Sequence, residues 1–167
     1  MDGLFDLNGS LVFRLNGTSI AQSIEGEASL TAENGRIYRA VFLGKIFSLL
    51  NIGEMLSGDF PDLEKEGFPY KTSTFKGRFK DGRIELETGV IDSSGMKIFY
   101  EGSEDLINRQ HDLTVVVAPL KTVDSVVEKI PLINSVLNKG AVIYPVKVRG
   151  SWDKPELSLL SPTAVGG

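Results

Sequence analysis

The residues with the most obvious chemical potential are His111 and Asp112, because an imidazole beside a carboxylate can act as a general base. His111 is the sole histidine and the chain has no cysteine, which excludes thiol nucleophiles and any site with two imidazoles. The preceding residues, Asn108-Arg109-Gln110, are typical of a polar turn between two strands. We therefore place His111 in such a turn and predict no catalytic residue. Nucleophile-elbow, Walker and dinucleotide motifs are also missing from the sequence.

Carboxylates gathered around Pro61 are the remaining candidates for metal binding: Asp59, Asp62, Glu64 and Glu66. A calcium loop needs oxygen ligands at fixed spacing with a glycine that enforces the turn, and that spacing is missing here. We interpret the cluster as a solvated loop, and we predict neither a metal nor a cofactor.

Apolar residues form the one group with two competing interpretations. In residues 39–52, Phe42, Ile46, Phe47 and Leu50 share one face of a predicted helix, with Lys45 on the other face. A later strand carries Leu113, Val115 and Val117 in a run that is apolar on both faces. These residues could form an ordinary core, or they could line a hydrophobic groove for an acyl chain. The residues alone leave both interpretations open.

Composition narrows the class of protein. The chain has 167 residues, which corresponds to one domain, with 41% hydrophobic and 24% charged residues. Its net charge of −4 argues against a nucleic-acid partner, which would favour a basic surface. The most apolar stretch, residues 40–52, contains Lys45 and is too short to span a membrane, since a spanning helix needs about 20 apolar residues. The first residues, Met1-Asp2-Gly3, do not resemble a signal peptide, although a fragment of an exported protein would also lack one.

Three dipeptides are typical of hairpin turns: Asn16-Gly17, Asn34-Gly35 and Asp81-Gly82. At the third, a two-residue loop predicts a complete register of cross-strand pairs: Lys80 with Arg83, Phe79 with Ile84, Arg78 with Glu85, Gly77 with Leu86, and Lys76 with Glu87. That register gathers apolar residues on one face and opposite charges on the other. At the second, Glu33 would face Arg36. After the first, a helical turn capped by Ser19 is favoured over a hairpin.

The remaining periodicity predicts further strands at residues 4–15, 96–101, 112–118 and 141–149. Pro145 indicates an edge position or a bulge in the last of these, and Trp152 is interpreted as an aromatic clamp at its end. Residues 122–130 and 131–139 have helical spacing, with Pro131 at the junction. The order of elements predicts an α+β fold with an antiparallel sheet, followed by a disordered tail at residues 161–167.

Several short motifs, in order, resemble the C-terminal region of the AsmA-like protein family. They are Asp59-Phe60-Pro61-Asp62-Leu63, Lys65-Glu66-Gly67-Phe68, Phe75-Lys76-Gly77-Arg78-Phe79-Lys80-Asp81-Gly82, Ile91-Asp92-Ser93-Ser94-Gly95, Glu101-Gly102-Ser103, Asp105-Leu106, Asp112-Leu113, Ala118-Pro119 and Val148-Arg149-Gly150-Ser151-Trp152-Asp153-Lys154-Pro155. Each motif is short and turn-like, and their order and spacing carry the resemblance across residues 4–160. The resemblance implies a single AsmA-like C-terminal domain over residues 1–160.

The resemblance also implies a fold and a role. The expected fold is α+β, with an antiparallel, curved β-sheet and with an amphipathic helix and a helix pair packed on one face. AsmA-like proteins are non-catalytic periplasmic proteins, anchored to the inner membrane, that are associated with phospholipid transport between the membranes and with outer-membrane assembly. The implied partners are phospholipid acyl chains, the rest of the full-length β-sheet and other envelope proteins. This chain has neither the anchor nor most of the sheet, so it would be a C-terminal piece.

Two hypotheses follow for function. The first is the lipid-handling end of a groove, with Phe42, Ile46, Phe47, Leu50, Leu113, Val115 and Val117 as the groove candidates. The second is a structural or interaction module that docks on another envelope protein without binding lipid. An enzyme is a third, disfavoured hypothesis because the sequence offers no catalytic constellation. Whether the predicted helices cover the apolar sheet residues distinguishes the first two.

Overall fold

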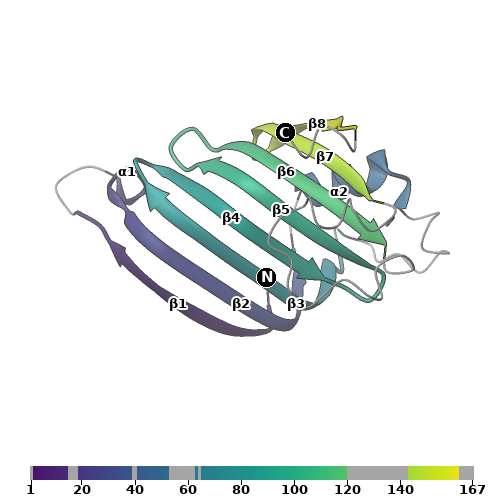
Figure 1. Cartoon of the computed structure of the whole chain (residues 1–167), viewed down its shortest axis with the longest axis horizontal. Helices are drawn as coiled ribbons and strands as arrows, with labels where there is room; N and C mark the ends of the chain where they lie inside the picture. The colour runs from purple at the N-terminus through teal and green to yellow at the C-terminus, as the bar shows by residue number, and fades with distance from the viewer. Residues whose placement is uncertain are drawn as a thin grey trace.

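Eight antiparallel strands form one twisted, curved sheet whose spatial order follows chain order from β1 to β8 (Figure 1). The structure, a computed structural model, describes residues 2–14, 19–38, 41–52, 63, 65–119 and 143–161. The elements are β1 Leu4–Val12, α1 Ile20–Ser23, β2 Glu25–Ile37, α2 Val41–Leu49, β3 Phe68–Lys80, β4 Arg83–Asp92, β5 Met96–Asp105, β6 Gln110–Pro119, β7 Tyr144–Ser151 and β8 Lys154–Leu159. The predicted antiparallel sheet is confirmed, and strands dominate the fold.

The β3–β4 hairpin turns at Asp81-Gly82 in the predicted register. Phe79 lies opposite Ile84, and the pairing continues to Gly77 opposite Leu86, beyond which the ladder has a bulge. Both turn residues have positive φ, 50° for Asp81 and 73° for Gly82, as a two-residue turn of this type requires. The charged side chains differ from the prediction in one respect. Arg78 forms ion pairs with Glu27 and Glu87 rather than with Glu85, which lies opposite it. The predicted Lys76–Glu87 ion pair forms, with 2.6 Å between Nζ and Oε2.

The predicted turn at Asn34-Gly35 is wrong. β2 runs straight through these residues, and its register with β3 is the same on both sides of them. Asn34 does adopt a positive φ of 52°, but the chain uses it for a local irregularity where Asp2 is held. The Asp2 side chain accepts a 2.6 Å hydrogen bond from the Arg36 amide, and its own amide donates to the Arg36 carbonyl. A side chain at position 35 would collide with the Asp2 carbonyl, which explains the glycine.

The other end of the sheet also differs from the prediction. The last strand is not residues 141–149, because β7 is followed by a further strand, β8, which pairs with it throughout Val146–Ser151. Pro145 therefore does not lie in an edge strand. It is the second residue of β7, before the ladder with β8 begins, where a missing N–H removes no bond to β8. Trp152 lies in the β7–β8 turn.

The predicted helical elements that fall on described residues are present. Ser19 caps α1 by accepting a hydrogen bond from the Gln22 amide, as the favoured sequence interpretation requires. α2 presents Leu43, Ile46 and Phe47 to the sheet and leaves Lys45 exposed. The helix pair expected at residues 122–139, the turn at Asn16-Gly17, most of the acidic loop around Pro61 and the tail after Ser161 lie outside the described residues.

Candidate functional site

One face of the sheet is apolar from β1 to β8. The register places Phe5, Ala32, Ile91, Ile98 and Val117 on the same face, since residues directly opposite one another in a ladder point the same way. The last four of these five belong to a single hydrophobic cluster with the buried face of α2. We call this surface the α2 face.

The part of the α2 face that α2 covers is the core, with buried residues from β2 to β7. Ile46 and Phe47 of α2 are buried, and the Phe47 ring packs against Phe68 with 5.2 Å between centroids. Val115 and Val117 are also completely buried in this cluster. Val116, on the other face of β6, is equally buried, in line with a run that is apolar on both faces.

A cleft of about 240 Å³ opens where α2 ends its cover of the sheet. It is lined by Ile37, Phe42, Leu43, Ser73, Phe75, Ile84, Leu86, Ile91, Tyr100, Glu104 and Leu113. Two of the groove candidates from the sequence, Phe42 and Leu113, are therefore at this cleft. Leu50 is half-buried against the core, while Ile46, Phe47, Val115 and Val117 lie in the interior packing.

Sequence reasoning did not assign Phe75, Tyr100 or Glu104 to a groove. For Ile84 and Leu86 the signal was present, because the predicted hairpin register gathers them on one apolar face of β3 and β4. Phe75 and Tyr100 join that surface only through the ladders that place β2 to β5 side by side. The combination of hairpin faces into one cleft is thus a property of the assembled sheet.

Tyr100 is one of the few polar residues in the cleft, and its hydroxyl is already engaged. It donates a 3.0 Å hydrogen bond to the Thr74 carbonyl. Burial raises the pKa of Tyr100 to about 12, because the phenolate would be poorly solvated in this surrounding. Tyr100 therefore behaves as an apolar wall with a satisfied hydroxyl rather than as an acid or base.

Glu104 provides a carboxylate at one end of the cleft. Its oxygens lie 2.8 and 3.0 Å from Nδ1 of His111, and Oε2 accepts a 2.8 Å hydrogen bond from the Trp152 indole. The His111 ring also lies against Phe42 of α2, with 5.8 Å between ring centroids. This group of side chains connects the end of β5, the start of β6, the β7–β8 turn and the first turn of α2.

The predicted position of His111 in a polar turn is wrong. His111 belongs to β6, and its side chain is only 9% exposed. Asp112 points to the opposite face, as adjacent strand residues do, and pairs with Lys147 at 2.7 Å. Lys147 and Arg149 lower the pKa of Asp112 by hydrogen bonding and charge. The adjacent histidine and aspartate of the sequence therefore form no catalytic pair.

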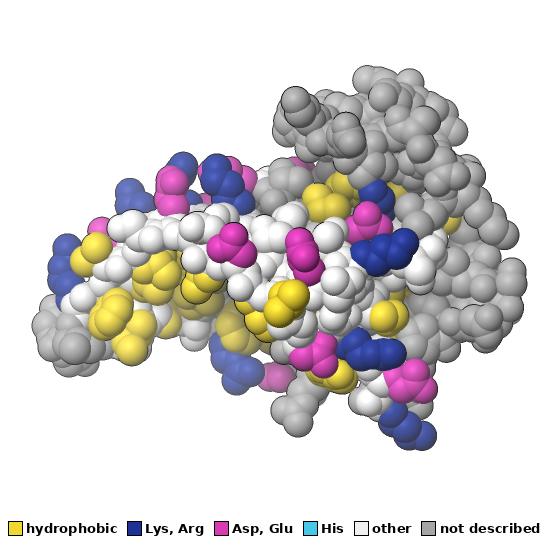
Figure 2. Space-filling view, turned by 90° about the horizontal axis from the view of Figure 1, so that it is seen from below, with side chains coloured by type: hydrophobic (Ala, Val, Ile, Leu, Met, Phe, Trp, Pro, Cys, Tyr) yellow, Lys and Arg dark blue, Asp and Glu magenta, His cyan; other side chains and the backbone are white. Residues whose placement is uncertain are grey.

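Near β1, the α2 face is bare. Phe5, Leu7, Leu11 and Phe13 are all exposed large hydrophobic residues at alternate positions. Figure 2, which views the molecule from the β1 side, shows hydrophobic side chains gathered along this edge. Leu7 lies opposite Leu30 of β2, which in turn lies opposite Phe75 at the cleft. The exposed row is therefore continuous with the cleft across neighbouring strands.

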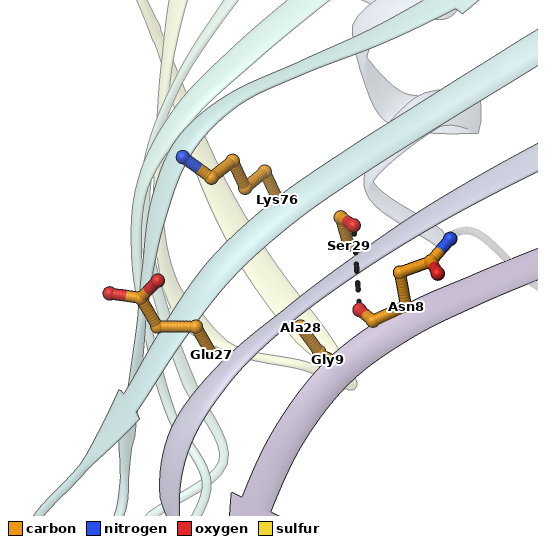
Figure 3. A pocket seen from close by; sticks show the side chains of 6 residues that line it. All are labelled: Asn8, Gly9, Glu27, Ala28, Ser29 and Lys76. Atoms are coloured by element: carbon orange, nitrogen blue, oxygen red, sulfur yellow. Dashed lines mark hydrogen bonds between the residues drawn. The ribbon is translucent and has the colours of Figure 1, made fainter.

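The opposite face of β1–β3 has a different character. Exposed side chains form a network of opposite charges there: Glu27 on β2, Lys76 and Arg78 on β3, and Glu87 on the neighbouring β4. A shallow hollow on β1–β3 is lined by Asn8, Gly9, Glu27, Ala28, Ser29 and Lys76 (Figure 3). The Lys76 and Glu27 side chains extend away from this hollow in Figure 3, and the Ser29 hydroxyl donates to the Asn8 carbonyl at 3.4 Å. This face is a solvated surface, so the cleft on the α2 face is the candidate site.

Comparison with protein-family models, curated proteins and solved structures finds no match to this chain. Within the described ranges, no group of three or more histidine, cysteine, aspartate or glutamate side chains is arranged to hold a metal ion. None of the helices in those ranges combines the length and the apolar character that crossing a membrane requires. The cleft and the bare apolar row are the features of the molecule that bear on its function.

Proposed function

We propose that this chain is a non-catalytic module whose α2 face holds the acyl chain of a lipid. The observation that carries the proposal is the continuity of one apolar face from the covered core, through the cleft, to the exposed row on β1. An apolar face that is half covered by its own helix and half bare is unusual for an isolated monomer. Such patches mark surfaces that bind lipids or other partners.

The cleft has the properties that an alkyl chain requires. Its walls are aliphatic and aromatic side chains, and the Tyr100 hydroxyl is satisfied by the backbone, so a chain of methylenes would displace water without leaving a polar group unpaired. Each buried methylene contributes about 0.8 kcal/mol, so a few in the cleft and along β1 would give useful affinity.

The resemblance to AsmA-like proteins supplies the biological setting of the proposal. The chain would be a periplasmic module of a longer protein, anchored to the inner membrane and acting in phospholipid transport between the inner and outer membranes and in outer-membrane assembly. Preceding strands of the full-length sheet would pair with β1 and extend the apolar face. The helix pair at residues 122–139 stays a prediction from the sequence.

Site-specific photo-crosslinking in the full-length protein within the bacterial envelope tests the proposal. Probes replace Phe75 and Leu86 at the cleft, with Glu85 on the opposite face of the same hairpin as the matched control. We expect labelled phospholipid at the two cleft positions and none at the control. Equal labelling of both faces, or silence at the cleft positions, would contradict the proposal. Mass spectrometry of lipid that co-purifies with the protein provides a second readout.

The alternative function, an interaction module that binds no lipid, is favoured by one observation. β1 is a long edge strand with exposed hydrophobic residues, and such edges pair readily with another strand. Crosslinks from Leu7 to another envelope protein, together with silence at Phe75, would support this alternative.

A further inference from the structure

We propose that Glu104 selects the head group of the amphiphile bound in the cleft and favours a primary ammonium. This inference rests on the proposed function, because it concerns the polar end of the same cleft. It adds a chemical class of ligand to a site that apolar walls alone would leave unselective.

The position of Glu104 gives the cleft a direction. Among the described residues that line the cleft, Glu104 carries the one charged side chain. It lies near the end of β5, opposite Ile84 at the start of β4. Ile91, near the end of β4, and Ile37, the last residue of β2, line the cleft on the side away from Glu104. Tyr100 is four residues before Glu104 on the same face, which corresponds to about 13 Å along the strand. An extended alkyl chain over Tyr100 would therefore end near the carboxylate.

Glu104 also retains the capacity to bind a donor. The indole of Trp152 donates one hydrogen bond to Oε2, and Nδ1 of His111 lies close to both oxygens. A carboxylate has about four acceptor positions, so these two neighbours do not exhaust it. Within the described part of the chain, His111 is its ion-pair partner, and Arg109 lies over the Trp152 ring and pairs with Asp153 instead. Arg83 donates to Ser103 on the opposite face.

Chemistry then distinguishes the head groups. A primary ammonium carries three donors and a positive charge, so it can add a charge-assisted hydrogen bond to Glu104. A hydroxyl head can donate without the charge. A carboxylate head would bring a second negative charge to a side chain that is only 16% exposed, where like charges are poorly screened. The expected order of affinity is amine, then alcohol, then carboxylate.

The test uses three probes with the same alkyl chain, dodecylamine, dodecanol and dodecanoate, below their aggregation concentrations. Isothermal titration calorimetry with the whole chain gives the dissociation constants, and the fluorescence of Trp152, the single tryptophan, reports occupancy near Glu104. We expect dodecylamine to bind about tenfold more tightly than dodecanol, the value of one hydrogen bond to a charged group.

Glu104→Gln should reduce that preference to less than about twofold, because Gln keeps the shape and loses the charge that distinguishes an ammonium from a hydroxyl. Glu85→Gln removes the same charge from the exposed opposite face and should retain the full preference. Thermal unfolding of each variant verifies that the fold is intact.

The outcomes separate the two levels of the proposal. If dodecylamine and dodecanol bind equally, or if the amine preference survives in Glu104→Gln, the head-group inference is wrong while the lipid-binding proposal stands. If none of the three probes binds, both are wrong.

Discussion

The two edges of the sheet contrast in almost every property that controls strand pairing. β8 has six residues, includes Pro155 and is held against α2 by a 2.8 Å hydrogen bond from Lys45 Nζ to the Pro155 carbonyl. β1 has nine residues, every one exposed, with neither proline nor a basic residue among them. Short length, proline and a covering helix are the usual devices that protect an edge from pairing. β8 therefore terminates the sheet, whereas β1 is suited to further pairing.

The same contrast extends into the two halves of the α2 face. Strands β2–β8 contribute residues to a core with α2, so the stability of this covered half depends on burial. β1 is held by its ladder with β2. It is also held by Asp2, just before the strand, whose carboxylate accepts hydrogen bonds from the Arg36 amide and the Tyr38 hydroxyl. The covered half should therefore be sensitive to substitution of its apolar residues, and the bare half should be tolerant.

The largest difference between the halves should come from placing a charge in each. Ile46→Asp should destabilise the protein by about 3–5 kcal/mol, because the side chain is 0% exposed and a carboxylate would be buried without a partner. Leu7→Asp, at a position 69% exposed, should change stability by less than about 0.5 kcal/mol. Urea denaturation measures both. Equal losses would mean that β1 is as tightly packed as α2.

Alkaline pH should weaken the covered half selectively through Tyr100. Its pKa is raised from 10.0 to about 12 in the folded state, so the unfolded state loses its proton first as pH rises. The contribution is fully present below pH 10.0 and is lost as the pH approaches 12, a change of about 2–3 kcal/mol. Tyr100→Phe should cost about 1 kcal/mol at neutral pH through the lost bond to Thr74, and this deficit should shrink or reverse in alkali. Absence of any convergence would contradict the burial of Tyr100.

Gly82→Val tests whether the two halves unfold together, because the β3–β4 hairpin links them. Gly82 has a φ of 73°, and a Cβ there would lie 2.3 Å from Cδ1 of Ile107, so we expect a loss of about 1–3 kcal/mol. Gly44→Ala in α2 is the matched control, since its Cβ would meet no atom closer than 4.0 Å, and it should be neutral or stabilising. Hydrogen exchange should show the Gly82 effect in both halves. An effect confined to the hairpin would mean that they unfold separately.

The smallest effect on stability, but the most direct test of the edges, comes from lysine substitution. Leu7→Lys in β1 and Leu159→Lys in β8 replace residues that are 69% and 58% exposed, so each should change stability by less than about 0.5 kcal/mol. Only Leu7→Lys should reduce self-association and the binding of a hydrophobic dye, because lysine discourages strand pairing where an edge is open. Sedimentation velocity measures the association. Identical behaviour of the two variants would remove the distinction between the edges.

The elements that could be predicted from sequence are those in which local signals agree. At Asp81-Gly82, turn chemistry, apolar alternation and charge placement all indicate one register, and that register forms. The buried side of helix α2 follows from the periodicity of its apolar residues, and the cap of α1 follows from Ser19. These signals lie within a few residues of one another, so no distant contact is needed to interpret them.

The errors arise where a distant residue decides the outcome. Asn34-Gly35 has the same composition as a hairpin turn, but contacts with Asp2, more than thirty residues away, make it an irregularity within β2. The polar neighbours of His111 predict a turn, whereas Glu104 on the adjacent strand holds the His111 side chain inside. Likewise, the sequence could not distinguish Leu113, at the cleft, from Val115, in the core, because the position of α2 over the sheet decides it.

The sequential order of the strands has a consequence for how such a sheet assembles. Because each strand pairs with its neighbours along the chain, the ladder can form by successive zipping of hairpins, with little loop-closure entropy at most steps. The exceptions are the β2–β3 step, from Ile37 to Phe68, and the β6–β7 step, from Pro119 to Tyr144, which must close longer connections, and we expect these two to be the slowest. A ladder of this kind also resembles a linear array with nearest-neighbour coupling. Adding or removing a hairpin at the β1 end would therefore leave every other pairing unchanged, and evolution could adjust the length of the sheet without redesigning its core.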